Sequence, residues 1–127
     1  MMNRQIFEVD TDTGTWGDTG PPFFGEVKQM RWNPTTADTG GDLKVALLPR
    51  EDDTGDGFEF FNDNDCLGTN FQRVPMQPMH GSDGAADPAD TGAAWGVPVA
   101  GAGDRLRVKV IPGGAAVVGR LYVWTGD

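Results

Sequence analysis

The chain has 127 residues, a net charge of −9 and one cysteine. Its length suits one domain, and its acidity disfavours nucleic acid and anionic membranes as partners because like charges repel. A single cysteine excludes an intramolecular disulfide, so stability has to come from packing or from association. Valine outnumbers leucine, and glycine and proline total 28 residues, a composition that favours strands and turns over helices.

Residues 1–22 predict an N-terminal arm and linker ahead of a domain at residues 23–127. Residues 5–9 could be extended, whereas the stretch that follows is mostly Asp, Thr, Gly and Pro and is too polar for a core element. We expect the arm to become ordered on a partner; the alternative is an edge strand of the chain's own sheet. The arm offers three side chains for strand addition or groove filling: Ile6, Phe7 and Val9.

Alternating apolar residues predict strands through the rest of the chain. Residues 24–33 form the first long candidate, in which a bulge near Lys28 would bring Val27, Met30 and Trp32 to one face. Further strands are expected at 42–49, 58–62, 67–75 and 95–101. In the first of these Leu43, Val45 and Leu47 would share one face, and Phe71 and Val74 are the expected anchors of the third.

The C-terminal stretch carries the clearest alternation. Leu106, Val108 and Val110 alternate with basic residues before Pro112-Gly113-Gly114, which predicts a β-hairpin with a return strand at 117–124. The return strand is apolar on both faces, which indicates burial on both sides or a hydrophobic face offered to another subunit. We therefore expect self-association.

These elements predict an all-β fold, an antiparallel two-sheet β-sandwich that is jelly-roll-like. The sandwich would carry long Gly/Asp/Pro-rich loops and the extended N-terminal arm. Two similar segments, residues 40–49 and 101–112, each lead from Gly-Asp into a strand that ends in Pro. A matching hairpin in each half fits a sandwich better than an open sheet.

The tripeptide Asp-Thr-Gly, which carries the catalytic carboxylate of retroviral-type aspartic proteases, occurs five times. A catalytic copy should follow a buried apolar strand, and none of these copies does. Asp bonds to nearby backbone and Gly accepts positive φ, so the tripeptide is typical of turns. The five copies begin at Asp12, Asp18, Asp38, Asp53 and Asp90.

Other catalytic candidates are few. His80 is the single histidine, and its polar neighbours Ser82 and Asp83 are adjacent in sequence, unlike a triad that is assembled from separate elements. Cys66 lies among acids that would raise the pKa of its thiol and make it inert. We predict no catalytic residues and no cofactor.

A calcium site is the alternative that the acidic loops leave open. Asp52, Thr54, Asp56 and Asp63 occupy positions 1, 3, 5 and 12 of an EF-hand-like loop, with glycine at position 6. Position 12 lacks the bidentate Glu, and the residues after the glycine indicate a strand. The candidate ligands are Asp52, Asp56 and Asp63.

The four tryptophans divide by context. Trp32 and Trp124 lie in expected strands, where core packing is the default. Trp16 and Trp95 lie in loops and are better candidates for a protein interface. A carbohydrate-stacking platform is the alternative use of these rings.

The stretches "GEVKQMRWNPTTADTGGDLKVALLP", "RVPMQPMHG" and "GDRLRVKVIPGGAAVVGRLYVW" resemble small β-sandwich virion proteins of tailed bacteriophages, in particular head decoration or cement proteins. The resemblance implies a non-enzymatic homo-oligomer, often a trimer, that sits on the capsid surface and braces adjacent major capsid protein subunits. The chain carries no apolar signal region, so we expect synthesis in the bacterial host cytoplasm. The alternatives are a tail, fibre or baseplate accessory protein, and a carbohydrate- or Ca-dependent binding module.

Overall fold

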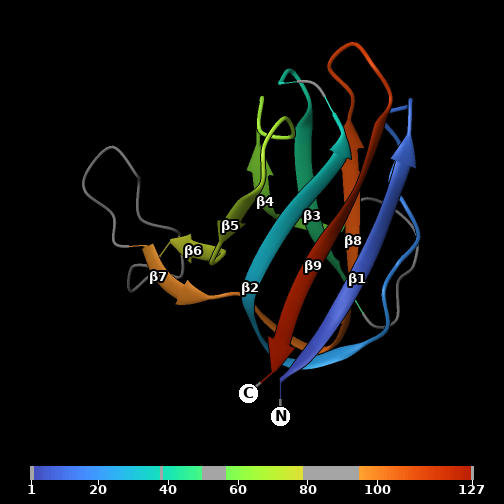
Figure 1. Ribbon diagram of the computed structural model, residues 1–127. Helices are drawn as coiled ribbons and strands as arrows, with labels where there is room; N and C mark the ends of the chain where they lie inside the picture. Colours follow the sequence, from blue (N-terminus) through green and yellow to red (C-terminus); the bar gives the residue numbers. More distant parts are fainter. Residues whose placement is uncertain (1, 38, 50–56, 79–94, 127) are drawn as a thin grey trace.

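The computed structural model describes residues 2–37, 39–49, 57–78 and 95–126, and every regular element among them is a strand. This confirms the all-β prediction. The strands are shown in Figure 1 and are β1 (Asn3–Thr11), β2 (Phe23–Thr36), β3 (Asp42–Leu48), β4 (Phe58–Asp63), β5 (Phe71–Arg73), β6 (Met76–Pro78), β7 (Trp95–Pro98), β8 (Ala100–Ile111) and β9 (Val117–Gly126).

Seven strands form one antiparallel sheet in the order β1-β9-β2-β8-β3-β4, and β5 also pairs with β2. The short strands β6 and β7 pair with each other and project to one side of this sheet (Figure 1). Because β1 and β9 run antiparallel from Asn3 opposite Thr125, the two ends of the chain lie close together.

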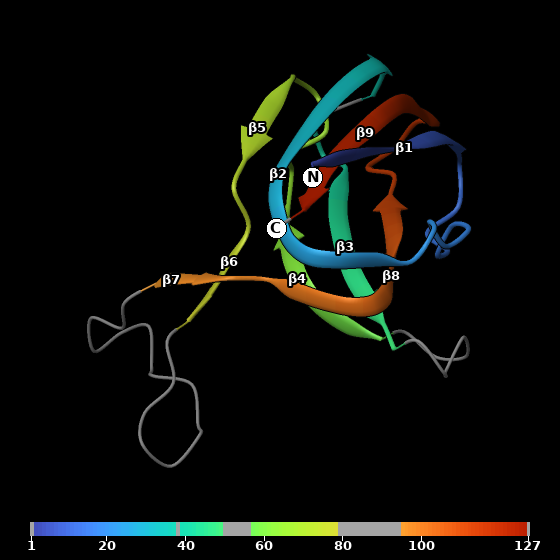
Figure 2. The same cartoon turned by 90° about the horizontal axis from the view of Figure 1, so that it is seen from below.

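The sheet curls because β2 and β8 each pair with different neighbours along their lengths. The start of β2 pairs with residues 100–104 of β8, and its remainder pairs with β9; residues 105–111 of β8 pair with β3. Figure 2 shows the sharp bend of β2 that results. Gly103 has a φ of 88°, a conformation that suits glycine, at the point where β8 changes partner.

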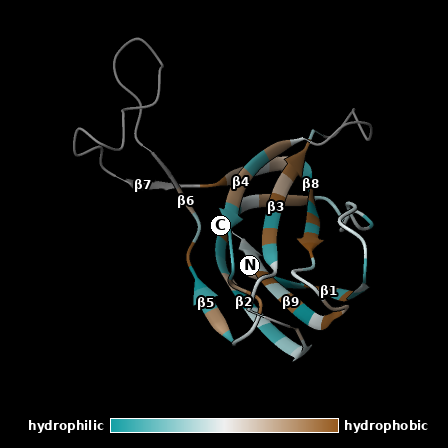
Figure 3. Ribbon diagram, turned by 90° about the horizontal axis from the view of Figure 1, so that it is seen from above, coloured by the Kyte–Doolittle hydropathy of each residue, from teal (hydrophilic) through white to brown (hydrophobic). Residues whose placement is uncertain are grey.

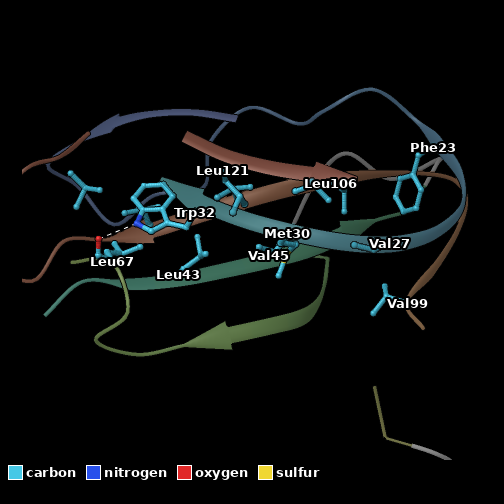
Figure 4. Packing of buried hydrophobic residues seen from close by; sticks show 14 residues of the cluster. Phe23, Val27, Met30, Trp32, Leu43, Val45, Leu67, Val99, Leu106 and Leu121 are labelled. Carbon is cyan, nitrogen blue, oxygen red and sulfur yellow. Dashed lines mark hydrogen bonds between the residues drawn. The ribbon is translucent and has the colours of Figure 1, made fainter. Parts of the chain in front are cut away.

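The core fills the inside of this curl. Along β8 and β9 the hydropathy alternates residue by residue, as Figure 3 shows, and the apolar side chains point inward. Trp32 is fully buried, and its Nε1 donates a hydrogen bond of 3.0 Å to the Leu67 carbonyl oxygen (Figure 4). This bond satisfies the one polar atom of the largest buried side chain.

The bulge predicted near Lys28 is present. Val27 pairs with Thr125 and Gln29 with Trp124, so Lys28 is the extra residue on β2. The bulge changes the parity of the strand and places Val27, Met30 and Trp32 in the core together.

Gly119 lets β9 lie against Trp32. A Cβ at this position would come within 2.6 Å of the Trp32 ring and 2.8 Å of the Asn33 carbonyl oxygen. Only glycine fits this close approach, and the pairing of β2 with β9 shifts register beside it, between Pro34 and Thr36.

The predicted C-terminal hairpin is wrong. β8 and β9 follow each other in sequence but do not pair; β2 lies between them in the sheet. The strands were expected correctly, yet alternation defines only which face of a strand is apolar and not which strand lies beside it. The connection at 112–116 therefore crosses from one side of the curl to the other. Of the two expected hairpins, only β3–β4 forms.

The N-terminal arm is the second difference. Residues 3–11 pair with β9 along their whole length, so the structure shows the edge-strand alternative and the segment belongs to the sheet. Part of the expected linker is also packed. The Gly17 and Gly20 amides donate hydrogen bonds to the carbonyl oxygens of Val108 and Leu106 on β8.

Two side-chain placements also differ. In β3, Leu43 and Val45 are buried as expected, but Leu48 is fully buried where Leu47 was expected, and a register shift against β4 occurs in the same strand. Val74 was expected to anchor the segment near β5, yet it is 54% exposed, and Leu67 is buried in the core instead.

Candidate protein-binding face

The outer surface of β9 and its two neighbours carries aromatic and basic side chains. β9 buries Val117, Leu121, Val123 and Thr125, whereas Tyr122 and its outward neighbours of the same parity lie on the other face. Pairing places Ile6 of β1 and Arg31 of β2 on either side of Tyr122, and Arg4 beside Trp124. We call this surface the β9 face; it consists of Arg4, Ile6, Arg31, Arg120, Tyr122 and Trp124.

The two rings of the β9 face stack on each other and are bounded by cations. The ring centroids of Tyr122 and Trp124 are 6.1 Å apart, with an interplanar angle of 26°. The Arg4 guanidinium lies 5.5 Å from the Tyr122 centroid, and that of Arg31 lies 5.7 Å from the Trp124 centroid. Cation–π contacts of this kind hold the rings and the guanidinium groups in a defined arrangement.

The charge of the β9 face opposes that of the chain. Arg120 pairs with Glu8 at 2.8 Å, and hydrogen bonds to Tyr122 and to Glu8 raise the pKa of Arg120, so that its charge persists at any ordinary pH. Asp10 lies at the edge of this surface, opposite Val118 across the β1–β9 pairing. The three arginines of the β9 face and the neighbouring carboxylates of Glu8 and Asp10 sum to one positive charge, in a chain whose net charge is −9.

Ile6 extends the face with apolar area. Its side chain is 46% exposed and lies opposite Tyr122 across the β1–β9 pairing. Tryptophan, tyrosine and arginine are the residues most enriched at the energetic centres of protein interfaces. The arrangement therefore has the chemistry of a protein-binding surface.

A second aromatic cluster lies on the outside of β8 and is covered by the chain itself. The Trp16 ring has Arg107 at 5.9 Å and Lys109 at 5.6 Å from its centroid, and residue 16 forms a bridge with Lys109. Arg107 Nε also donates a hydrogen bond of 3.2 Å to the Gly17 carbonyl oxygen. We call Trp16, Arg107 and Lys109 the β8 face.

The predicted partner-binding residues are divided between these places. Ile6 is on the β9 face, whereas Phe7 and Val9 alternate with it and pack against the core. Trp16 is half-buried against β8. Trp95 begins β7, and its side chain lies outside the described residues.

The β9 face contains one residue that was predicted to lie in the core, Trp124, and two that the sequence did not indicate, Arg4 and Arg31. Trp124 was assigned to the core by default, yet it is only half-buried and lies on the outer face, opposite in parity to Leu121 and Val123. Parity was the signal that could have placed it. Arg4 and Arg31 had no such signal, because they join the rings only through strand pairing.

The calcium and catalytic candidates lie mostly outside the described residues. This applies to Asp52, Asp56 and His80. Asp63 ends β4, and its carbonyl oxygen accepts a 3.5 Å hydrogen bond from the Cys66 thiol. Within the described ranges, no group of three or more His, Cys, Asp or Glu side chains could hold a metal ion.

Cys66 is a half-buried thiol in the turn after β4. Burial, followed by the negative charge of Asp63, raises the pKa of Cys66 to about 11. The acidic neighbours act in the predicted direction, although burial has the larger effect. The thiol is therefore protonated at neutral pH and is a poor nucleophile.

Two of the five Asp-Thr-Gly copies lie among the described residues. The copy at Asp12 begins in a bend after β1, in keeping with the turn interpretation. The copy at Asp18 instead belongs to the extended stretch along β8, where Gly20 donates to the Leu106 carbonyl oxygen. Neither follows a buried strand residue.

Comparison with protein-family models, with curated proteins and with solved structures finds no match to this chain. Among the described residues, no helix is long and apolar enough to cross a membrane.

Proposed function

We propose that the chain is a non-enzymatic structural protein of a bacteriophage virion. In this proposal it decorates the capsid shell and braces adjacent major capsid protein subunits, as a homo-oligomer for which a trimer is favoured. The observation that carries the proposal is the β9 face, a sheet surface whose stacked Tyr122 and Trp124 are ringed by arginines. The same proposal assigns the curled sheet to the jelly-roll-like β-sandwich class.

The β9 face supports a protein partner better than a carbohydrate. A sugar ring would stack on an open aromatic face, whereas Arg4 and Arg31 already lie over the Tyr122 and Trp124 rings. Arginine and aromatic side chains together are typical of the centre of a protein interface. Since β1 is paired within the sheet, its contribution to a partner would be the exposed Ile6 and not a detached arm.

The test is binding to an assembled shell. The chain would be coexpressed with the major capsid protein encoded nearest to its gene, and the shells separated on a density gradient. We expect the wild-type chain to migrate with the shells and a much smaller fraction of Trp124→Ala to do so. Trp16→Ala, on the β8 face, is the matched control and should still bind.

The same experiment separates the alternatives. Migration with tail or baseplate particles in place of shells would favour an accessory protein of those structures. Binding to a glycan array, with or without calcium, and no binding to any particle would replace the virion proposal with a carbohydrate- or Ca-dependent binding module.

A further inference from the structure

A groove of about 800 Å³ runs along the edge strand β1. Its first wall consists of eight consecutive residues of that strand, 4–11, and its second wall is made by residues of the stretch 15–21. Val108 and Val110 of β8 line it as well. A groove that follows one strand for eight residues has the shape of an extended chain, about 26 Å long at 3.3 Å per residue.

The backbone of β1 is free along this groove. β1 is the first strand in the sheet order and pairs only with β9. In the part of the chain that the structure describes, no backbone hydrogen bond joins β1 to the stretch 15–21, whereas that stretch is bonded to β8 through Gly17 and Gly20. The backbone N–H and C=O groups on the free edge of β1 are therefore available, and edge strands of this kind accept an added strand.

One buried acceptor in the groove also lacks a partner. Gln5 is 8% exposed, and its Nε2 donates a 3.2 Å hydrogen bond to the Pro21 carbonyl oxygen on the opposite wall of the groove. Among the described residues, nothing donates to its Oε1. A buried amide oxygen without a hydrogen bond is costly, so a donor that enters the groove would be stabilised there.

The charges of the groove are uneven along its length. Arg4, at one end, lies against Tyr122, and Glu8, in the middle, is paired with Arg120. Asp10 and Asp18 lie toward the other end, and within the described ranges neither has an ion-pair partner. That end favours a cation, while Phe7, Val9 and the two valines favour apolar side chains.

We propose that the groove binds an extended peptide segment of a partner protein, which adds as an antiparallel strand to the free edge of β1. The segment has apolar residues at alternate positions and lysine or arginine at its N-terminal end, beside Asp10 and Asp18. This site shares Arg4 and Ile6 with the β9 face but uses the free backbone edge of β1, and it does not depend on the virion proposal.

The test uses the full chain and a blocked synthetic peptide, Lys-Lys-Val-Thr-Val-Thr-Val-Thr. Hydrogen exchange should slow across residues 3–11 when the peptide is added, but not across residues 58–63 of β4, the other edge strand of the sheet. A peptide with glutamate in place of both lysines, and one with proline in place of the central valine, should not produce the slowing.

Affinity for the same peptide tests the charge argument. Asp10→Asn combined with Asp18→Asn should weaken binding about tenfold. Asp12→Asn combined with Asp65→Asn is the matched control, since neither residue lines the groove, and should leave binding unchanged, as should Trp124→Ala.

Three results would overturn the proposal: no slowing at residues 3–11 up to about 1 mM peptide, equal slowing with the glutamate peptide, or an unchanged affinity in the Asp10/Asp18 double variant.

Discussion

The β9 face and the β8 face use the same chemistry to different ends. Each places an aromatic ring near 5.5 to 5.9 Å from basic groups on the outside of a strand. On β8 the ring comes from the connection between β1 and β2, which folds over the strand and is hydrogen-bonded to it. On β9 the rings belong to the strand itself, and no described segment crosses them.

The two faces contain the same residue types, so the difference is whether another segment of the chain packs over the ring. A ring that is packed over forms an internal contact, whereas an uncovered ring is available to a partner. Trp16 is already used to hold a connecting segment against β8, so its loss should affect stability. Tyr122 and Trp124 hold no other segment, so their loss should affect binding. Variants of the two faces separate these effects.

The largest effect is expected at Gly119, where β9 packs against Trp32 of β2. Gly119→Ala should lower the free energy of unfolding by about 3 kcal/mol, because the new methyl group would meet the Trp32 ring and the Asn33 carbonyl oxygen. Urea-induced unfolding followed by tryptophan fluorescence measures the change.

Gly14→Ala is the control for Gly119→Ala. A Cβ on Gly14 would meet Ile111 at an ordinary contact distance of 3.6 Å. Its unfolding midpoint should stay close to that of the wild type. Equal midpoints for both alanine variants would show that Gly119 is not needed for the packing of β9.

The next effect compares the two tryptophans. Trp124→Ala should weaken binding to the assembled shells by about 2 kcal/mol, or about thirtyfold, because it removes the larger ring at the centre of the β9 face. Trp16→Ala should instead lower the urea midpoint and leave shell affinity unchanged. Both are measured by quantitative sedimentation with shells and by unfolding.

The reverse result would invert the comparison. If Trp16→Ala abolished shell binding while the variant remained folded, the β8 face would be the interface and the cover over it would have to move.

A smaller effect is expected for the cations. Arg31→Gln should weaken shell binding by about 1 kcal/mol at low salt, because it removes a charge over Trp124 at a surface complementary to an acidic partner. The difference from wild type should shrink as salt screens the interaction. Sedimentation at two salt concentrations measures it.

Arg107→Gln is the matched change on the β8 face. It removes the hydrogen bond to the Gly17 carbonyl oxygen and should destabilise the fold slightly without a salt-dependent loss of binding. A salt-dependent loss for this variant as well would mean that general charge, and not the β9 face, controls association.

The smallest effect concerns Cys66, which belongs to neither face. With a folded pKa of about 11, its alkylation should be slow at pH 8 and should accelerate as pH rises toward 11.

Because the folded pKa of Cys66 is raised above the unfolded value of about 9, the stabilising effect of the neutral thiol is present below pH 9 and is lost between pH 9 and pH 11.

Timed alkylation followed by mass spectrometry measures that thiol. Trp124→Ala and Arg31→Gln should show the wild-type rate, since both lie on the β9 face and Cys66 lies in the turn after β4. Fast labelling at pH 8 in the wild-type chain would contradict the burial of the thiol.

Local pattern carried much of the fold. The alternation in β8 and β9 marked both strands and their apolar faces, and the change of parity around Lys28 located the bulge that brings Met30 and Trp32 into the core. These features depend on residues a few positions apart, where the two-residue period of a strand determines which side chains share a face.

The same alternation predicted only part of the β9 face. The outward row of Val118, Tyr122 and Trp124 was readable from β9 alone, as one of two alternatives. The arginines that surround the rings come from β1 and β2, 91 to 118 positions earlier in the chain, as the pairs Arg31 with Tyr122 and Arg4 with Tyr122 show.

The sequence by itself determined that this chain is an antiparallel β protein with polar, Asp- and Gly-rich connections. Tertiary structure decided the rest: β9 lies between β1 and β2 and is not paired with β8, residues 3–11 are a strand of the sheet, and Trp16 closes over β8 while Trp124 stays open. The physical reason is that strand partners are chosen by contacts between distant segments. Alternation gives a strand two faces but does not specify what covers either of them.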